Sequence, residues 1–163
     1  MKFKGKKFNY VFAKKNLPNG RVAWVDVIEH PGASLIIPFL TRDKIIFLRQ
    51  YRAVIGRYLY ELPAGTLDKG ESPLSCAKRE LIEETGRAGR VIRKIGEIYP
   101  VPGYSTEIIY IFKAEKLFIA QADKDPDEII ETVILSRRQI RQFLAQGKIK
   151  DAKTICALAL AGI

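Results

Sequence analysis

Residues 61–89 read ELPAGTLDKGESPLSCAKRELIEETGRAG and carry the clearest local signals in the chain. It begins at the end of a short apolar run, continues with a loop that contains two glycines and ends in a segment whose apolar residues have helical spacing. Ser72 and Pro73 are typical of a helix start, because serine caps the first turn and proline loses no hydrogen bond at the first helical position. Gly86 is typical of a helix end. The stretch therefore predicts a loop followed by a helix over residues 73–85.

One side of this predicted helix is apolar and is expected to face the core. At about 100° per residue, its apolar side chains fall together: Leu74, Ala77 and Leu81. Glu80, Glu83 and Glu84 crowd into one turn along the edge of that face. Like charges at this spacing repel one another, so the cluster is stable only if cations neutralise it. Arg79 can neutralise Glu83 one turn further along, which leaves the other two carboxylates.

These carboxylates suit a hard divalent cation. Mg²⁺ and Mn²⁺ prefer oxygen ligands, usually keep several waters and take further oxygens from a phosphate substrate. The single histidine, His30, argues against a histidine-rich zinc site. Taken alone, the helix also fits a solvated surface helix with alternating charges. The preceding loop favours a site, because Gly65 and Gly70 bracket a tight connection where backbone groups can approach a ligand closely.

The composition fits one soluble domain. The chain has 163 residues, of which 47% are hydrophobic and 28% charged. Its formal net charge of +10 suggests an anionic partner, yet nucleic acid, a membrane surface, a phosphorylated small molecule and simple solubility all explain it. No apolar run reaches the ~20 residues of a membrane span, and no secretory segment follows the N-terminus. We expect a cytoplasmic protein that does not bind membranes, with Cys76 and Cys156 as reduced thiols.

The rest of the chain mixes strand-like runs with two further helices. An N-terminal hairpin is expected from two runs joined by a Pro-Asn-Gly turn, at residues 8–12 and 21–28. Six more strand-like runs follow, at residues 34–40, 44–50, 58–62, 91–98, 108–117 and 129–135, and the first two of these are expected to pair with each other. Ser136 with Gln139 predicts a capping box for a helix ending near Gly147, and Asp151 predicts the cap of a last helix. This order predicts an α/β or α+β fold with helices on both faces of a sheet.

The central stretch resembles the Nudix hydrolases, whose box reads G-x5-E-x7-R-E-U-x-E-E-x-G-U, where U is a bulky aliphatic residue. The chain matches that spacing at Gly65, Glu71, Arg79, Glu80, Leu81, Glu83, Glu84 and Gly86. The final U is Arg87, so the hydrophobic contact expected there is replaced or absent, although no chemical group is lost. The resemblance implies an α/β/α sandwich with a mixed sheet, in which residues 1–163 form a single domain.

Shorter motifs are similar to the ADP-ribose pyrophosphatase branch of these hydrolases. They are RQYR at 49–52, ELPAG at 61–65, YPVPGYSTE at 99–107 and DEIIE at 127–131, and Pro102 follows Gly86 at the spacing of that branch. The branch implies hydrolysis of ADP-ribose to AMP and ribose 5-phosphate. Alternatives are another nucleoside diphosphate sugar, a capped RNA end or a non-catalytic nucleotide-binding module. No RNA-binding motif is visible, which makes nucleic acid the less favoured partner, and intact Glu80 and Glu84 argue against a non-catalytic module.

The resemblance also implies roles for single residues in the box and after it. Glu80, Glu84 and the backbone carbonyl of Ala64 would bind about two or three Mg²⁺ ions per site, with Mn²⁺ as the alternative metal. Glu83 would orient Arg79 or share a metal-bound water, and Glu71 would fix the loop and the helix start, while Gly65 and Gly86 shape the box. Catalytic assistance to the attacking water is assigned to Glu128, with Asp127 as second choice; both also fit a solvated loop.

Two further residues are implied in substrate binding. Arg52 matches a position that contacts the phosphates or the ribose, and Trp24 matches an aromatic residue that stacks on adenine. A lone tryptophan on a strand also fits a core or dimer contact. In relatives of this branch an N-terminal extension joins two chains, so residues 1–32 are expected to form a β extension used in a homodimer.

Overall fold

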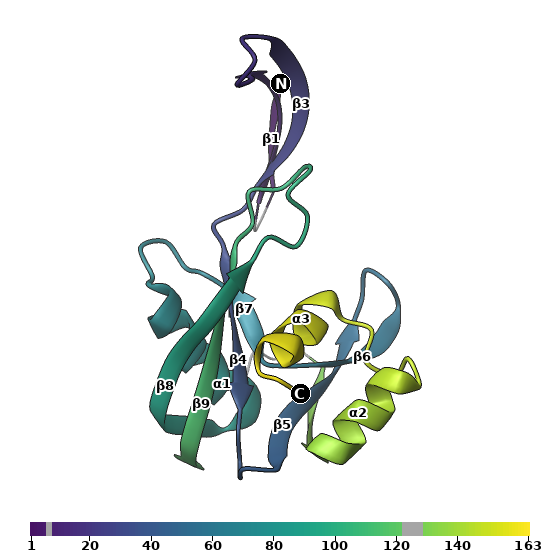
Figure 1. Cartoon of the computed structure of the whole chain (residues 1–163). Helices are drawn as coiled ribbons and strands as arrows, with labels where there is room; N and C mark the ends of the chain where they lie inside the picture. The colour runs from purple at the N-terminus through teal and green to yellow at the C-terminus, as the bar shows by residue number, and fades with distance from the viewer. Residues whose placement is uncertain (6–7, 122–128) are drawn as a thin grey trace.

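The computed structural model describes residues 1–5, 8–121 and 129–163 (Figure 1). Four strands form its central sheet, in the order β7-β4-β9-β8. Their bounds are Ala33–Pro38 for β4, Ala64–Thr66 for β7, Arg87–Ile98 for β8 and Ile109–Ile119 for β9. β4 and β9 run parallel, whereas the other neighbours in this sheet are antiparallel. The central sheet is therefore mixed, as predicted.

A second sheet and the helices cover the central sheet. The second sheet has the order β10-β5-β6, and its strands are β5 Lys44–Arg52, β6 Arg57–Glu61 and β10 Ile130–Ser136. The helices are α1 Pro73–Thr85, α2 Arg137–Ala145 and α3 Ala152–Leu160. α1 packs on one face of the central sheet, and the second sheet with α2 and α3 lies on the other (Figure 1). This arrangement confirms the α+β sandwich with helices on both faces.

Strand β4 is the centre of the core because both of its faces are buried. Leu35 and Ile37 pack toward the second sheet, α2 and α3. Ile36 points the other way and packs with Ala77 and Leu81 of α1. A strand buried on both faces reads as a continuous apolar run, which explains the sequence ASLIIP. It gives the site described below a rigid base.

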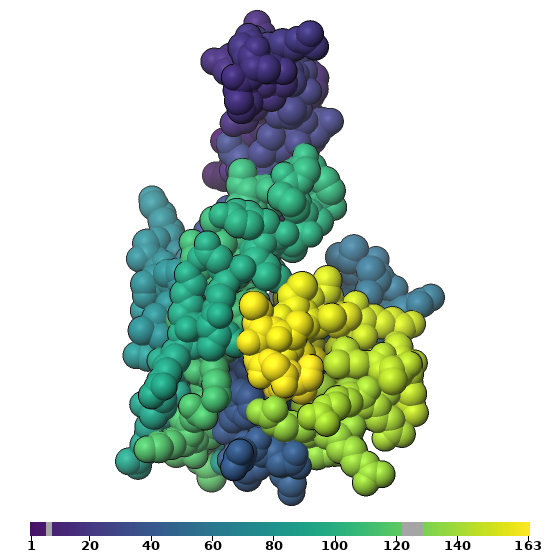
Figure 2. All heavy atoms as spheres, viewed as in Figure 1, coloured from purple at the N-terminus to yellow at the C-terminus, as the bar shows by residue number. Residues whose placement is uncertain are grey.

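The N-terminal strands form a separate sheet that projects from the body (Figures 1 and 2). Its antiparallel strands are β1 Lys2–Lys4, β2 Asn9–Asn16 and β3 Val22–Glu29, so the predicted hairpin is confirmed and gains one strand. The backbone N–H of Ile28 donates to the carbonyl of Tyr104 at 2.7 Å, and Thr106 donates to the carbonyl of Ile28 at 3.0 Å. These bonds join the base of the projecting sheet to the loop after β8.

Several local expectations differ from the structure. The runs at 34–40 and 44–50 are neighbours in sequence but lie in different sheets, joined by a single bridge between Phe39 and Ile45. The box expects a hydrophobic residue at position 87, where this chain has Arg87. In the structure Arg87 is the first residue of β8, and its backbone pairs with Ile119 of β9. Leu74 is 39% exposed, because it lies in the first turn of α1, before the segment that buries side chains.

Candidate active site

Helix α1 carries the acidic residues and is fixed at both ends as predicted. The Ser72 hydroxyl accepts a hydrogen bond from the backbone N–H of Ser75 at 3.1 Å. Gly86 ends the helix in a left-handed conformation with φ of 65°, which favours glycine. Ser34 of β4 donates its hydroxyl to the Pro73 carbonyl at 2.7 Å. The helix is thereby held in register against the central sheet.

Gly65 allows the Glu80 carboxylate to lie against the backbone of β7. A Cβ atom added at Gly65 would lie 1.7 Å from Glu80 Oε1 and 2.0 Å from its carboxyl carbon. Real Cβ atoms never approach so closely, so any other residue here would displace the carboxylate. The first glycine of the box is therefore required by the position of its glutamate.

Glu84 is a buried carboxylate directed at the same loop. Its side chain leaves the residue 5% exposed, and Oε2 accepts a hydrogen bond from the Ala64 N–H at 2.9 Å. A buried carboxylate is stable when backbone donors and cations compensate for lost water. The contact places Glu84 beside Ala64, the residue whose carbonyl was expected to join the metal ligands.

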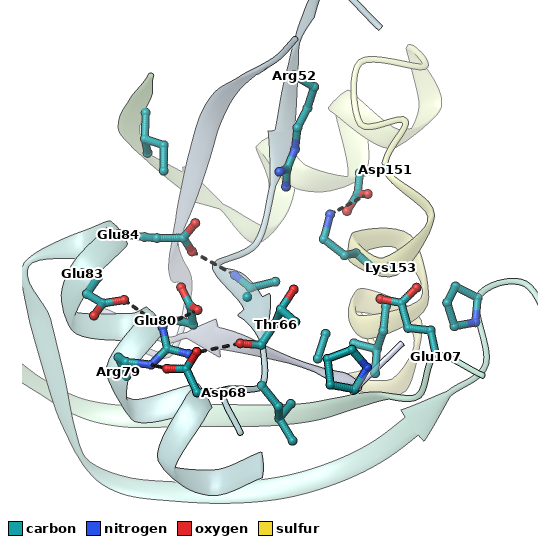
Figure 3. Close-up of a pocket in the computed structure, with 18 of the residues that line it drawn as sticks. Arg52, Thr66, Asp68, Arg79, Glu80, Glu83, Glu84, Glu107, Asp151 and Lys153 are labelled. Carbon is teal, nitrogen blue, oxygen red and sulfur yellow. Dashed lines mark hydrogen bonds and ion pairs between the residues drawn. The ribbon is translucent and has the colours of Figure 1, made fainter. Parts of the chain in front are cut away.

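Arg79 ties the acidic residues of α1 to the preceding loop (Figure 3). Its Nε and Nη2 each donate to one oxygen of Glu71 at 3.0 Å. Its Nη1 donates to Glu80 Oε1 at 2.7 Å and to Glu83 Oε2 at 3.0 Å. Nη2 also donates to the Thr66 carbonyl at 3.2 Å. The planar guanidinium thus positions three carboxylates together, including the predicted partner Glu83.

The same contacts shift the acid–base equilibria of this network. The hydrogen bonds that Arg79 donates to Glu71, together with the neighbouring glutamates, raise the pKa of Arg79 above its usual value. The hydrogen bonds from Arg79 lower the pKa of Glu71, and the Asp68 N–H, which donates to Glu71 at 3.0 Å, acts in the same direction. Both groups stay charged at neutral pH, so the loop and the helix remain joined by an ion pair.

Arg52, at the end of β5, is held by a second buried carboxylate. Its Nε and Nη2 donate to the two oxygens of Glu61 at 2.7 and 2.6 Å. Glu61 is 1% exposed. Burial opposes the ionised carboxylate, but the hydrogen bonds and charges of Arg52 and Lys153 outweigh it, so the pKa of Glu61 is lowered. The bidentate pairing fixes the direction in which Arg52 points.

A cavity of about 1150 Å³ brings these groups together. Glu80, Glu83 and Glu84 line the cavity from α1, and Arg52 lines it from the end of β5, across from them in Figure 3. Figure 3 shows Lys153 and Asp151 of the α3 region beside Arg52, and Glu107 from the loop before β9. In Figure 2 the surface is hollowed between the segment near residue 100 and α3.

Sequence reasoning missed three of these lining residues: Glu107, Asp151 and Lys153. A signal existed for two of them. Glu107 ends the YPVPGYSTE motif, and Asp151 was recognisable as a helix cap. Nothing in the sequence relates Lys153 to a glutamate 92 residues earlier, because that contact depends on how α3 packs against the end of β6.

One predicted site residue, Trp24, does not line this cavity, and the predicted catalytic residue cannot be placed from the described part of the chain. Trp24 lies on β3 in the projecting sheet, 61% exposed, and stacks on Phe12 with 5.1 Å between ring centroids. It does not line the cavity of its own chain. Glu128 and its alternative Asp127 lie outside the described residues. The structure thus gathers Arg52 and the box residues but leaves these assignments as predictions.

This combination of sandwich, acidic helix and glycine loop defines a family. The model of the NUDIX domain matches residues 29–158, and the chain belongs to that family. An ADP-ribose pyrophosphatase of Bacillus subtilis is 34% identical over 96% of this chain and 85% of its own length. A methanol dehydrogenase activator of Bacillus methanolicus is 34% identical over 87% of this chain and 78% of its own.

Two further comparisons extend the range of relatives. A GDP-mannose pyrophosphatase of Yersinia enterocolitica is 36% identical over 81% of this chain and 73% of its own length. A crystal structure of an ADP compounds hydrolase superposes with a TM-score of 0.82, covering 98% of this chain and 86% of its own, at 22% identity. At that identity the structural match supports the fold alone.

The donor set of the cavity fits the divalent ions that Nudix hydrolases need, generally Mg²⁺. Glu80 and Glu84 supply carboxylate oxygens, and Gly65, which has no side chain, leaves room for the Glu80 carboxylate against β7. In the described part of the chain, no group of three or more acidic, histidine or cysteine side chains could hold a metal ion by itself. Mg²⁺ is usually bound by one or two carboxylates with water and substrate oxygens completing its shell.

None of the helices in residues 1–5, 8–121 and 129–163 is long and apolar enough to cross a membrane.

Proposed function

We propose that this protein hydrolyses the pyrophosphate bond of ADP-ribose, giving AMP and ribose 5-phosphate, with divalent metal ions as cofactors. The observation that carries the proposal is the placement of Glu80 and Glu84 on one side of the cavity and Arg52 on the other. An anionic diphosphate fits between an edge that can hold metal ions and a fixed guanidinium. The 34% identity to the Bacillus subtilis ADP-ribose pyrophosphatase, over nearly the whole chain, supports this substrate.

Residues at different positions in the cavity have different roles in the proposed reaction. Glu80, Glu84 and the Ala64 carbonyl would hold about two or three Mg²⁺ or Mn²⁺ ions. When bound, such ions withdraw charge from phosphorus and lower the pKa of a bound water. Arg79 keeps Glu80 and Glu83 in place through its two contacts at Nη1. Arg52, directed by Glu61, would contact the phosphates or the ribose of the substrate.

Proton removal from the attacking water needs a base near the reacting phosphorus. We assign Glu128 to this role, with Asp127 as the alternative, on the resemblance of DEIIE to the ADP-ribose pyrophosphatase branch. Glu83 would share a metal-bound water or orient Arg79. In the structure Glu83 accepts from Arg79 and lines the cavity, which supports the orienting role.

A second candidate substrate is another nucleoside diphosphate sugar, because the GDP-mannose pyrophosphatase of Yersinia enterocolitica is 36% identical over 81% of the chain. The deciding experiment is a panel containing ADP-ribose, GDP-mannose, ADP-glucose and capped RNA, assayed with Mg²⁺, Mn²⁺ or a chelator and analysed by product mass. Metal-dependent release of AMP from ADP-ribose at the highest kcat/KM supports the proposal. Higher kcat/KM for GDP-mannose or capped RNA overturns it, and binding without any product identifies a non-catalytic module.

We also propose a cytoplasmic homodimer in which residues 1–32 join two chains and Trp24 meets the substrate of the partner. Both cysteines are free thiols, which fits a reducing compartment. The projecting sheet leaves several large side chains exposed, among them Phe3, Phe12, Val22 and Trp24. Exposed apolar patches of this kind are typical of interaction surfaces. Trp24 does not line the cavity of its own chain, and in such a dimer it would lie close to the cavity of the partner.

A further inference from the structure

A second cluster of charged groups stands across the cavity from the acidic edge of α1. Asp151 caps α3: its Oδ2 accepts from the Thr154 N–H at 3.0 Å and from the Thr154 hydroxyl at 2.6 Å. Lys153 donates from Nζ to Asp151 Oδ1 at 2.8 Å and also to Glu61 Oε2. The first turn of α3 therefore belongs to the wall of the cavity.

Glu61 organises the two cations of this cluster. It is buried behind them and accepts hydrogen bonds from both Arg52 and Lys153. The side chains of Arg52 and Lys153 remain 38% and 18% exposed, and both line the cavity. The carboxylate therefore faces the protein interior, whereas the cations face the space that a ligand would occupy.

Within the described residues, the hydrogen bonds of the two cations do not use all of their donors. A guanidinium carries five N–H groups and an ammonium three. Arg52 uses one at Nε and one at Nη2 for Glu61. Lys153 uses two of its three, for Glu61 and Asp151. The side facing the cavity therefore presents spare N–H donors on charged groups, and such donors suit the oxygens of an anion better than a neutral or cationic ligand.

We propose that Lys153 is a substrate-binding residue that forms, together with Arg52, an anion subsite for a phosphate of the diphosphate. The acidic edge at Glu80 and Glu84 faces this subsite across the cavity, as Figure 3 shows. A diphosphate between them would have the residues that would hold metal ions on one side and the N–H donors of Arg52 and Lys153 on the other. The inference rests on the proposed function, because it assigns a phosphate compound to this cavity.

The competing interpretation gives Lys153 a structural role, as a cation that neutralises buried Glu61. The two roles differ in what a loss of charge changes. A structural role affects the free energy of unfolding and leaves the affinity of a folded variant unchanged. A binding role raises the dissociation constant of every ligand that carries the phosphate, while the chemical step after binding is altered much less.

The test compares Lys153→Met, Lys153→Arg and the control Lys150→Met, which removes an exposed lysine that does not line the cavity. Calorimetry measures Kd for ADP and for a methylene-bridged analogue of ADP-ribose that is not hydrolysed, and steady-state kinetics measures KM and kcat for ADP-ribose. We expect Lys153→Met to raise Kd and KM about tenfold or more, with kcat within about threefold. Lys153→Arg and Lys150→Met should stay within about threefold of wild type in Kd.

A folded Lys153→Met variant with the Kd of wild type for both ligands overturns the inference. If Lys153→Met does not fold, Lys153→Gln removes the charge and keeps an N–H donor for Glu61, and the same Kd comparison applies. ADP separates this inference from the proposed function: a wild-type protein that does not hydrolyse ADP-ribose refutes the function, while the loss of ADP affinity in Lys153→Met still supports the subsite. Wild-type protein that binds neither ligand overturns both.

Discussion

Glu84 combines burial, negative charge and a fixed direction in one side chain. Its hydrogen bond from Ala64 holds the carboxylate in the cavity wall, where an ionised oxygen can serve as a metal ligand. We predict that Glu84→Gln lowers kcat about a hundredfold or more, because the amide keeps an acceptor for Ala64 but loses the charge. The measurement is AMP release from ADP-ribose over a range of Mg²⁺ concentrations.

Glu97→Gln is a matched control for this variant, since Glu97 is an exposed glutamate of β8 paired with Lys94 and lies outside the cavity wall. It should leave kcat and the thermal midpoint unchanged. Circular dichroism should show that Glu84→Gln is folded. Near-normal turnover of Glu84→Gln with Mg²⁺ would refute the metal assignment.

Gly65 is required at its position by its close contact with the Glu80 carboxylate. In Gly65→Ala, the new methyl group would occupy the place of the Glu80 carboxylate. We predict at least a tenfold loss of kcat/KM and a loss of about 1–3 kcal/mol in the free energy of unfolding. Gly103→Ala is the control for stability, because a Cβ at Gly103 would have no heavy atom within 4 Å. Equal activity and stability of the two variants would contradict this explanation.

At the scale of elements, local signals predicted α1 closely. Ser72, Pro73 and Gly86 mark its ends through interactions within a few residues, so the sequence alone locates the helix that carries the acidic cluster. The capping box at Ser136 is also confirmed for the same reason. The ends of such helices can be predicted from the sequence without knowledge of the tertiary structure, because they depend on interactions between neighbouring residues.

Contacts between distant segments were not predictable in this way. β4 and β5 share an apolar composition, but packing on either side of the core separates them into two sheets. The three-residue strands β1 and β7 carry too few residues for a periodic signal and exist because a partner strand lies beside them. The position of Lys153 at the cavity likewise depends on tertiary packing of α3.

The contact between Glu71 and Arg79 makes the junction of loop and helix sensitive to acid. The pKa of Glu71 is lowered in the folded protein, so its contribution to stability is complete above the unfolded carboxyl value of about 4.3 and is lost as pH falls through the folded value. We predict that wild type has a higher thermal midpoint than Glu71→Gln at pH 7 and that the difference shrinks below about pH 4.

Thermal unfolding of both proteins from pH 7 to pH 3 measures this difference. Glu115→Gln, which removes a partly exposed partner of Lys113 on β9, is the control for a general charge effect. A gap between wild type and Glu71→Gln that stays constant over the whole range would show that the ion pair does not stabilise the fold.

At the scale of the whole molecule, the projecting sheet predicts association. A particle of twice 18.5 kDa, about 37 kDa, is expected by light scattering. Trp24→Asp should shift the mass toward one chain, because a charge on the exposed face of β3 opposes burial against a partner. Ile134→Asp, a change at a comparably exposed residue of β10, should leave the dimer intact. A stable monomer for wild type at micromolar concentration would contradict the prediction.

The parallel pairing of β4 with β9 also has a consequence for how the chain acquires its shape. Residue 33 finds its partner at residue 109, and Leu62 donates its N–H to Thr154, 92 residues further on. Hairpins such as β2–β3 can close early, whereas contacts of such high contact order close slowly. During synthesis the cavity is therefore complete only after β9 and α3 have left the ribosome, and we expect nascent chains that end before β9 to lack ligand affinity.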